Sequence, residues 1–484
     1  MPTGAERFYH DVSLRGPVPD RLLLRLPDHA DETAAEAALA DRVADLARAH
    51  ARAFFAREAA SFAYAQSFAW LDALAHREDG RHVAAALWEA WVRDHGRYGA
   101  RAWAPALAAA RTEHMLRHAP LLLEGRDGPA REGLFGTLIR QIRHLARAAR
   151  KGQFPEPRVL LAARAAIGTL ALPLAAEPER QVKAPLTAAL SQLGGGRLPD
   201  GLGDTALAIE TGRTLHALQH AYAVRGLTPP GSLPDALAVL RLLLGGLRIA
   251  PGAGLAVLPG GVEGVPGIID AIAPLDRAEA DAVLSAYGLA VLRANGTSVH
   301  VTGEAGAGGA FCLSDGPARL VTAAGAPSAG LRAVDPALRD WGNALAAPAA
   351  AATLDADRLG AATLEREDDA EGSVITLSRD GPAGTHTRRL FLRADGTALI
   401  GEDSAWAAGL TYRFPLHPDI AARRAGSDRA VLTLPSGRSW RIETAQAELR
   451  IEEGVYSGGG VPRRAEQLVL TAGREGTRWA IRRG

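Results

Sequence analysis

Residues 387–403, "TRRLFLRADGTALIGED", decide the fold of the C-terminal half of this chain. Apolar and polar residues alternate on both sides of Asp395-Gly396, a dipeptide typical of tight hairpin turns. A second stretch, "AVLTLPSGRSWRIE" (430–443), turns in the same way about Ser436-Gly437. Further short alternating segments continue to the C-terminus with no helical segment between them. The pattern predicts an antiparallel β-sandwich and not a parallel sheet.

The N-terminal half has a different period. From about residue 33 to 250, apolar residues recur at the three- and four-residue spacing of amphipathic helices. Some eight or nine helices joined by short Gly/Pro breaks predict stacked antiparallel helix pairs. We therefore expect an α+β multidomain chain, with a helical domain at 1–255 and a β-sandwich at 256–484.

Local signals mark several helix ends. Thr33 with Glu36, and Ser232 with Asp235, are spaced as capping boxes, in which each side chain satisfies a free backbone N–H at a helix start. Gly152 is expected to end the helix that begins near residue 128, because glycine readily adopts the left-handed conformation of a helix C-terminus.

The composition excludes several classes of function. The 484 residues carry a formal net charge of +1, so no global field favours nucleic acid or anionic lipid as a partner. No apolar run approaches the roughly 18 residues of a membrane span, and the N-terminus lacks the apolar core of a secretory signal. We therefore expect a cytoplasmic protein. Cys312 is the only cysteine, which excludes an internal disulfide and a cysteine-built zinc site.

Four stretches of the C-terminal third resemble the heparinase II/III-like family, especially its alphaproteobacterial members. They are "HTRRLFLRADGTALIGED" (386–403), "YRFPLHPDIAA" (412–422), "LPSGRSWRIE" (434–443) and "IEEGVYSGGGVPRRAEQLVL" (451–470). Weaker stretches of the same kind lie at 118–149 and 311–327. The resemblance implies an incomplete (α/α) toroid of helical hairpins followed by an antiparallel β-sandwich.

The resemblance also implies a reaction. Characterised members are polysaccharide lyases, which take the C5 proton of a uronic acid and expel the 4-linked sugar by β-elimination. This chemistry needs a tyrosine or histidine base, a group that neutralises the uronate carboxylate, and an acid for the leaving oxygen. The implied partner is an anionic polysaccharide or oligosaccharide. Some members also hold a structural zinc in the sandwich with histidines and an aspartate.

This chain departs from the family pattern at the positions that would carry the chemistry. The segment 157–172 lacks the family's Asn-His pair, and Arg197 stands where a histidine is expected. In the sandwich, the segment 304–314 has no histidine, and Ala351 replaces another. We therefore expect no metal and no cofactor. The alternative to a lyase is a catalytically inactive glycan-binding or assembly protein on the same fold. The resemblance also implies an alternative to the cytoplasmic location, because sugar-degrading members of the family work in the periplasm or cell envelope.

The remaining candidates for a lyase site lie mostly in "RTLHALQHAYAVRG" (213–226). His216 and His220 are four residues apart and share a helix face, with Tyr222 half a turn on. They are candidate catalytic residues, although ordinary helix packing would give the same pattern. The candidate ligands of a uronate carboxylate are Arg197, Arg213, Arg463 and Arg464.

Two further hypotheses concern histidine and carboxylate residues. His417, at the first bend of "YRFPLHPDIAA", is either a functional residue or a polar residue that stabilises a strand end. A hydrolase would need two facing carboxylates; Glu113, Asp204 and Glu210 are available, but nothing in the sequence pairs them. The tryptophans are mostly spaced as helix-core residues, although their rings could also stack on sugars.

Overall fold

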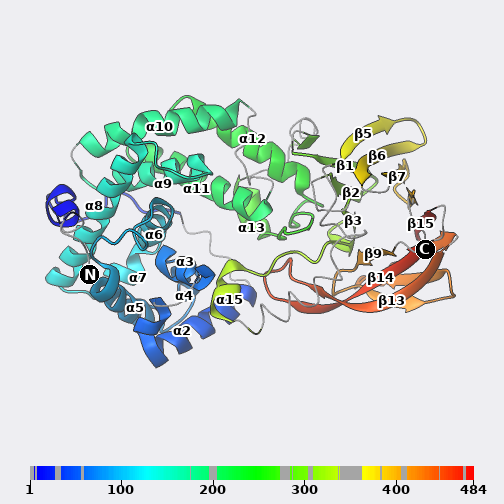
Figure 1. The fold of residues 1–484 in the computed structure, drawn as a ribbon, viewed down its shortest axis with the longest axis horizontal. Helices are drawn as coiled ribbons and strands as arrows, with labels where there is room; N and C mark the ends of the chain where they lie inside the picture. The colour runs from blue at the N-terminus through cyan, green and yellow to red at the C-terminus, as the bar shows by residue number, and fades with distance from the viewer. Residues whose placement is uncertain are drawn as a thin grey trace. The chain divides into compact units, whose positions relative to one another are not determined.

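The computed structural model describes residues 5, 8–27, 34–55, 59–174, 176–195, 204–272, 284–285, 287–303, 309–335, 337, 362–381, 384–404, 411–445, 447–472 and 476–484. The chain forms two compact units. The helical unit comprises Met1–Gly203, Leu207–Arg241 and Ala329–Pro336, and the strand unit comprises Asp204–Ala206, Leu242–Ser328 and Ala337–Gly484. Figure 1 shows the helices in blue to green and the strands in green to red. The domain boundary expected after residue 255 stays a prediction.

The N-terminal half is built from consecutive helices that form an incomplete (α/α) toroid. Their bounds are η1 (Tyr9–Ser13), α2 (Ala34–Phe55), α3 (Ala59–Ser67), α4 (Trp70–Leu74), α5 (Gly80–His95), α6 (Pro105–Arg117), α7 (Ala119–Leu123), α8 (Gly128–Arg150), α9 (Arg158–Ala171), α10 (Ala176–Gly194), α11 (Thr205–Val224) and α12 (Ser232–Leu247), with α13 (Pro266–Ile272) and α15 (Ala329–Val334) later in the chain. Helix α2 packs on α5, while α9 packs on α6, α8 and α10.

Helix α9 is the most deeply buried helix of this unit among the described residues. Every residue from Val159 to Ala171 is buried, as expected for a helix that is apolar on all sides. Gly168 lets α8 approach closely, because a Cβ at this position would lie 2.9 Å from the Ile142 side chain. The segment that lacks the family's Asn-His pair is thus a core helix.

Aromatic side chains form the other part of the helical core. Trp70, Trp91 and Trp103 are at most 1% exposed, so these rings pack inside and present no face to a sugar. The Arg111 guanidinium lies 4.6 Å from the centre of the Trp91 ring, and it donates to Gln141 Oε1 over 2.9 Å. The expectation that the tryptophans are core residues is confirmed for these three, whereas Trp341 lies outside the described residues.

The described residues of the C-terminal half form three antiparallel sheets. The first holds β1 (Leu289–Ala294), β2 (Thr297–Thr302), β3 (Phe311–Asp315) and β4 (Ala318–Val321) in that order. The largest has the order β10-β11-β12-β15-β8-β7-β6-β5, with bounds Ala421–Arg424, Arg429–Thr433, Ser439–Ala445, Thr477–Arg483, Ala398–Asp403, Gly384–Arg393, Gly372–Gly381 and Thr363–Asp368. The third is β13-β14-β9, with bounds Ala447–Tyr456, Arg463–Ala472 and Thr411–Pro415.

One apolar core joins these sheets. It includes Val299 and Phe311 of the first sheet, Leu399 and Trp479 of the largest, and Phe414 of the third, all at most 3% exposed. The ring of Trp479 stacks on that of Phe311 at 5.6 Å. In strands such as β12, alternate residues are buried, so the period-two pattern of the sequence places one face of the strand inside, whereas β2 and β3 are buried along their whole length.

The predicted architecture is confirmed, and so are both predicted hairpins. β7 and β8 flank Gly396 at a φ of 67°, and β11 and β12 flank Gly437 at a φ of 81°, which only glycine adopts without strain. Helix α8 ends at Arg150, and Gly152 follows with a φ of 66°, as predicted.

One capping box is wrong and another lies outside the described residues. Helix α12 begins at Ser232 itself, and within the described ranges the Ser232 Oγ has no hydrogen-bond partner, so this side chain does not cap the helix. Thr33, the start of the other box, is not among the described residues. The sequence also missed the short helices α3 and α4, which carry aromatic residues with little helical periodicity.

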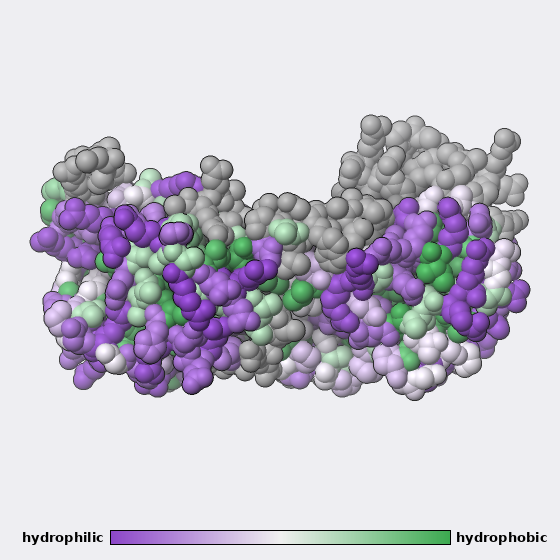
Figure 2. Space-filling model, turned by 90° about the horizontal axis from the view of Figure 1, so that it is seen from below, coloured by the Kyte–Doolittle hydropathy of each residue, from purple (hydrophilic) through white to green (hydrophobic). Residues whose placement is uncertain are grey.

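Polar side chains cover most of the face drawn in Figure 2, and the apolar areas on it are small and separate. Among the described residues, no helix combines the length and apolar character needed to cross a bilayer.

Candidate functional site

A pocket of about 400 Å³ in the strand unit is lined by His417 together with acidic, basic and hydroxyl side chains. Its lining residues are Glu263, Pro317, Ala318, Arg319, His417, Asp419, Ile420, Pro435, Ser436 and Arg438. They come from the segment before α13, from β4, and from the turns that follow β9 and β11. His417 thus lies at a place where four distant parts of the chain meet.

Backbone contacts place Glu263 at the base of this pocket. Its N–H donates to the Gly458 carbonyl over 2.8 Å, and its carbonyl accepts from Leu255 N–H over 2.7 Å. Gly458 must be glycine here, because a Cβ would lie 2.6 Å from the Tyr456 hydroxyl. Gly458, in the turn between β13 and β14, therefore allows close packing against Tyr456.

Three side chains surround the Glu263 carboxylate. The Tyr456 hydroxyl donates to Oε1 over 2.5 Å, Arg319 Nη1 lies 3.1 Å from Oε2, and His417 Nε2 lies 3.5 Å from Oε1. The rings of His417 and Tyr456 meet edge to face at 4.8 Å. Arg319 also donates to the Leu255 carbonyl through Nε and Nη2, so its orientation is fixed. We call Glu263, Arg319, His417 and Tyr456 the Glu263 cluster.

The protonation states in the Glu263 cluster are set by these contacts. Burial raises the pKa of Glu263, but His417, Arg319 and Tyr456 outweigh burial and hold the pKa at about 2. Burial, together with the Glu263 carboxylate, raises the pKa of Tyr456 far above its ordinary value. Glu263 is therefore a permanent anion at neutral pH, and Tyr456 is a permanent hydrogen-bond donor. Neither group can exchange a proton with a substrate near neutral pH.

His417 uses both ring nitrogens inside the protein. Its Nδ1 accepts from the Asp419 N–H over 3.3 Å, which requires the tautomer with the proton on Nε2, facing Glu263. The lone pair that a catalytic base would need is thus occupied by a backbone donor. This geometry favours the interpretation of His417 as a residue that stabilises a strand end.

The candidate residues of α11 face different neighbours. Burial lowers the pKa of His216, and the nearby Arg241 of α12 and His220 lower it further. Burial raises the pKa of Tyr222, and the nearest charge that adds to this is Glu179 of α10. His220 thus influences His216, whereas Tyr222 is influenced by a charge on α10. Their catalytic role stays a prediction.

The candidate arginines are found in three different settings. Arg213 is half-buried, and within the described ranges its Nε has no hydrogen-bond partner. Arg463 pairs with Asp419 over 2.9 Å, and Arg464 pairs with Glu453 over 3.2 Å, both on the surface of β14. Arg197 lies outside the described residues, as does Ala351. Substrate binding by these arginines stays a prediction.

The sequence could not pair the carboxylates, but the structure joins two of them through Arg164 of α9. Its Nε donates to Glu113 Oε2 over 2.6 Å, and its Nη2 donates to Glu210. Arg117 donates to the other Glu113 oxygen over 2.5 Å, and Thr214 donates to Oε2 over 3.0 Å. The buried Glu113 carboxylate thus accepts hydrogen bonds from Arg117, Arg164 and Thr214.

Glu113 cannot serve as the general acid that a glycosidase needs. Burial raises the pKa of Glu113, but Arg164 and Arg117 outweigh burial and hold the pKa at about 2. A general-acid carboxyl needs the opposite shift, toward neutral pH. Asp204 is used elsewhere, where its Oδ1 caps α11 at Ala206 N–H over 2.8 Å. The arrangement therefore argues against the hydrolase hypothesis.

Sequence reasoning identified His417 but missed its three partners. Glu263 stands alone in the Gly/Pro-rich passage "GGVEGVPG", where an isolated charged residue is the one available signal. Tyr456 ends an alternating stretch just before three glycines, which marks a strand end but not its partner. Within the described residues, no group of three or more His, Cys, Asp or Glu side chains could hold a metal ion.

Comparisons with known proteins agree with this fold. Residues 279–481 match the family model "Heparinase II/III-like, C-terminal". The "FtsZ-localized protein C" of Caulobacter vibrioides (strain NA1000 / CB15N) is 29% identical over 470 residues, which cover 83% of this chain and 77% of that protein.

Solved structures extend the likeness to the whole chain. The crystal structure of Heparinase III has a TM-score of 0.67 at 11% identity, covering 99% of this chain and 88% of that one. A mutant of the heparan sulfate lyase HepC from Pedobacter heparinus gives a TM-score of 0.54 at 14% identity, with the same coverage. At such identities the likeness establishes the fold.

Proposed function

The C-terminal residues 279–481 match the heparinase II/III-like C-terminal family, and from this premise we propose that the chain is an assembly protein that localises with FtsZ. In this proposal, the polysaccharide-lyase fold serves as a scaffold for interactions and does not turn over a glycan. The proposal develops the alternative of a non-catalytic assembly protein that the sequence left open.

The observation that carries the proposal is the long alignment with the FtsZ-localized protein C. It covers 83% of this chain and 77% of the relative, so it includes both halves of the fold and not one shared domain. The solved lyases share the fold at 11% to 14% identity. The FtsZ-localized relative is thus twice as similar in sequence as these lyases.

The polar clusters support the same proposal. Glu263 is saturated by Arg319, His417 and Tyr456, and Glu113 by Arg117 and Arg164. Active sites usually hold titratable groups with pKa values poised for proton transfer, whereas these clusters hold fully ionised carboxylates. Such networks fix the positions of chain segments and leave no proton to transfer.

The test has two arms with the full-length protein. In the first, the protein is pelleted with polymerised FtsZ of the source organism, and a fluorescent fusion is imaged in cells together with FtsZ. In the second, heparin, heparan, alginate and chondroitin are incubated with the protein, and the ultraviolet absorbance of unsaturated product is followed. We expect co-pelleting and co-localisation, with no rise in absorbance. Failure to pellet or co-localise with FtsZ would overturn the proposal.

The competing proposal is a lyase that acts on an anionic glycan, and the His417 pocket is the observation that favours it. In this pocket His417 lies together with two arginines, Arg319 and Arg438. A rise in absorbance that is lost in His417→Ala would establish this reaction. A rise that is lost in His220→Ala with Tyr222→Phe, and kept in His417→Ala, would place the base on α11 as the sequence predicted.

The cytoplasmic location expected from the sequence stays a prediction that the imaging arm also tests. Fluorescence of the fusion at the FtsZ structures would support it, whereas signal confined to the cell envelope would favour the periplasmic alternative.

A further inference from the structure

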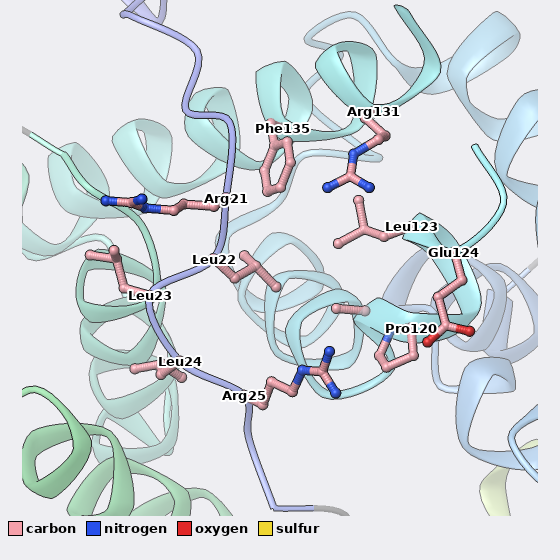
Figure 3. A pocket seen from close by; sticks show the side chains of 11 residues that line it. Arg21, Leu22, Leu23, Leu24, Arg25, Pro120, Leu123, Glu124, Arg131 and Phe135 are labelled. Atoms are coloured by element: carbon pink, nitrogen blue, oxygen red, sulfur yellow. The ribbon is translucent and has the colours of Figure 1, made fainter. Parts of the chain in front are cut away.

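A second pocket, in the helical unit, has a different chemistry. It encloses about 380 Å³ between the segment 21–25 and helices α7 and α8. Figure 3 shows the Arg25 and Arg131 side chains on opposite sides of the pocket, with Leu22 and Leu123 between them and Phe135 beside Arg131. We call this the arginine pocket. It shares no residue with the Glu263 cluster or with the candidate sites named above.

The walls of the arginine pocket are fixed by contacts outside it. The N–H of Leu23 donates to the Ala171 carbonyl at the end of α9 over 2.8 Å. Arg117 of α6 donates to the Pro27 carbonyl over 3.1 Å, which holds the other end of the segment. Phe135 is 1% exposed and forms part of the core beneath the pocket. The pocket is therefore preformed, so binding would not have to order its walls.

Among the described residues, the cations of this pocket have no acidic partner. Arg21, Arg25 and Arg131 are exposed, and none of them forms an ion pair or side-chain hydrogen bond with another described residue. The acid on the rim, Glu124, is already paired with Arg81 over 2.5 Å. Other surface arginines of this unit do have carboxylate partners, such as Arg52 with Asp94 at 2.7 Å. Three free guanidinium groups around one apolar pocket thus leave a local positive charge uncompensated.

The guanidinium groups and the apolar side chains of the pocket together favour a ligand that has both carboxylates and an apolar group. Guanidinium groups bind carboxylates with paired hydrogen bonds, and the Leu22, Leu123 and Pro120 side chains suit an aliphatic or aromatic group. Stacking on a sugar ring would need an exposed aromatic face, and Phe135 is buried, so the pocket offers no stacking surface. Nucleic acid would need an extended basic surface, and the chain as a whole carries a net charge of only +1.

We propose that the arginine pocket docks an acidic segment of a partner protein. One apolar side chain of that segment enters between Arg25 and Arg131, and flanking carboxylates pair with the two guanidinium groups. This inference goes beyond the FtsZ proposal and does not depend on it, because it specifies the chemistry of the partner and not its identity.

The test uses a fluorescein-labelled peptide of sequence Asp-Glu-Phe-Glu-Asp and fluorescence polarisation with the full-length protein. We expect Arg25→Glu and Arg131→Glu each to weaken binding by about tenfold or more, since each removes a charge-assisted pair and adds a repulsion. The matched control is Arg180→Glu, an exposed arginine of α10 with no ion pair to a described residue. It should change binding less than about twofold. Melting temperatures of the variants confirm that they are folded.

Two further probes test the chemistry of the pocket. A peptide with serine in place of phenylalanine should bind about tenfold more weakly, because it cannot fill the apolar part. Inorganic phosphate should not compete at equal concentration. Equal binding by the Arg25→Glu and wild-type proteins would overturn the proposal, and so would a preference for heparin or duplex DNA over the peptide. Because none of these measurements involves FtsZ, their failure would leave the FtsZ proposal standing, and the reverse also holds.

Discussion

Burial opposes the ionisation of Glu113 and Glu263, yet both carboxyl groups have a pKa of about 2. At Glu113, Arg164 and Arg117 outweigh the cost of burial, whereas at Glu263 the largest opposing effect comes from His417, with Arg319 and Tyr456 adding to it. A buried ion pair is a weak source of net stability, but removing one partner is costly, because the other charge stays buried. The two carboxylates are therefore the residues at which single substitutions should be most informative.

Glu113→Gln should lower the free energy of unfolding by about 3 kcal/mol. The amide leaves Arg117 without a charged partner and removes one of the two carboxylates on Arg164. The measurement is chemical denaturation at pH 7. Glu132→Gln, an exposed position of α8, is the control and should change stability by less than about 0.5 kcal/mol. Equal stabilities of the two variants would show that the network contributes little.

The same variant should also change the pH dependence of stability. The pKa of Glu113 is lowered in the folded state, so its contribution is fully present above its ordinary pKa and is lost as the pH falls toward about 2. Between pH 5 and pH 3 the wild-type protein should therefore lose stability more steeply than Glu113→Gln. Parallel curves in this range would contradict the assigned pKa.

Tyr456→Phe should destabilise the protein by about 1–2 kcal/mol, because a half-buried carboxylate loses a hydrogen-bond donor. Tyr412→Phe is a matched control, since its hydroxyl is buried and has no hydrogen-bond partner among the described residues. This control should be neutral or slightly stabilising. Denaturation of both variants under one set of conditions gives the comparison.

At the scale of single elements, the turn between β13 and β14 determines how Glu263 and Tyr456 meet. β13 ends at Tyr456, and the chain then passes through Gly458, whose carbonyl accepts from Glu263 N–H. The Cα of Gly458 has no room for a side-chain carbon, since a Cβ would also lie 2.9 Å from the Val257 side chain. The element is thus built around close backbone approach and not around a ligand.

Gly458→Ala should cost about 1–3 kcal/mol, because the added methyl group must displace the Tyr456 ring or the turn. Gly454→Ala in the preceding strand β13 is the control, since its nearest neighbour would lie at an ordinary 3.7 Å. Thermal denaturation compares the two. A larger loss in Gly454→Ala than in Gly458→Ala would mean that strand propensity, and not close packing, limits this hairpin.

At the scale of the whole molecule, the two polar clusters belong to different compact units. Arg117, Arg164 and Thr214, which contact Glu113, all lie in the helical unit. The three residues that contact Glu263 all lie in the strand unit. Neither cluster shares a side chain with the other. The arginine pocket lies in the helical unit and uses a third set of residues.

The effects of Glu113→Gln and Gly458→Ala should therefore add. In a double-mutant cycle, we expect the free energy of unfolding of the double variant to equal the sum of the single effects within about 0.5 kcal/mol. A coupling energy above about 1 kcal/mol would show that the two units share energetic contacts. Chemical denaturation of the four proteins measures it.

The sequence by itself determined the elements that depend on neighbours along the chain. The turns at Asp395-Gly396 and Ser436-Gly437 require glycine at a positive φ, and the periods of two and of 3.6 residues report directly which face is buried. These signals predicted the helical half, the strand half and both hairpins. They failed at α3 and α4, and at the Ser232 cap, where packing and not local pattern decided the outcome.

Only the tertiary structure decided which polar residues meet. Tyr456 and Glu263 are 193 positions apart, and Arg164 joins carboxylates 51 and 46 positions away. Such pairs depend on how whole elements close on one another, and no local spacing encodes that closure. The arginine pocket has the same origin, because segment 21–25 lies beside α7 and α8 only once the helical unit is folded.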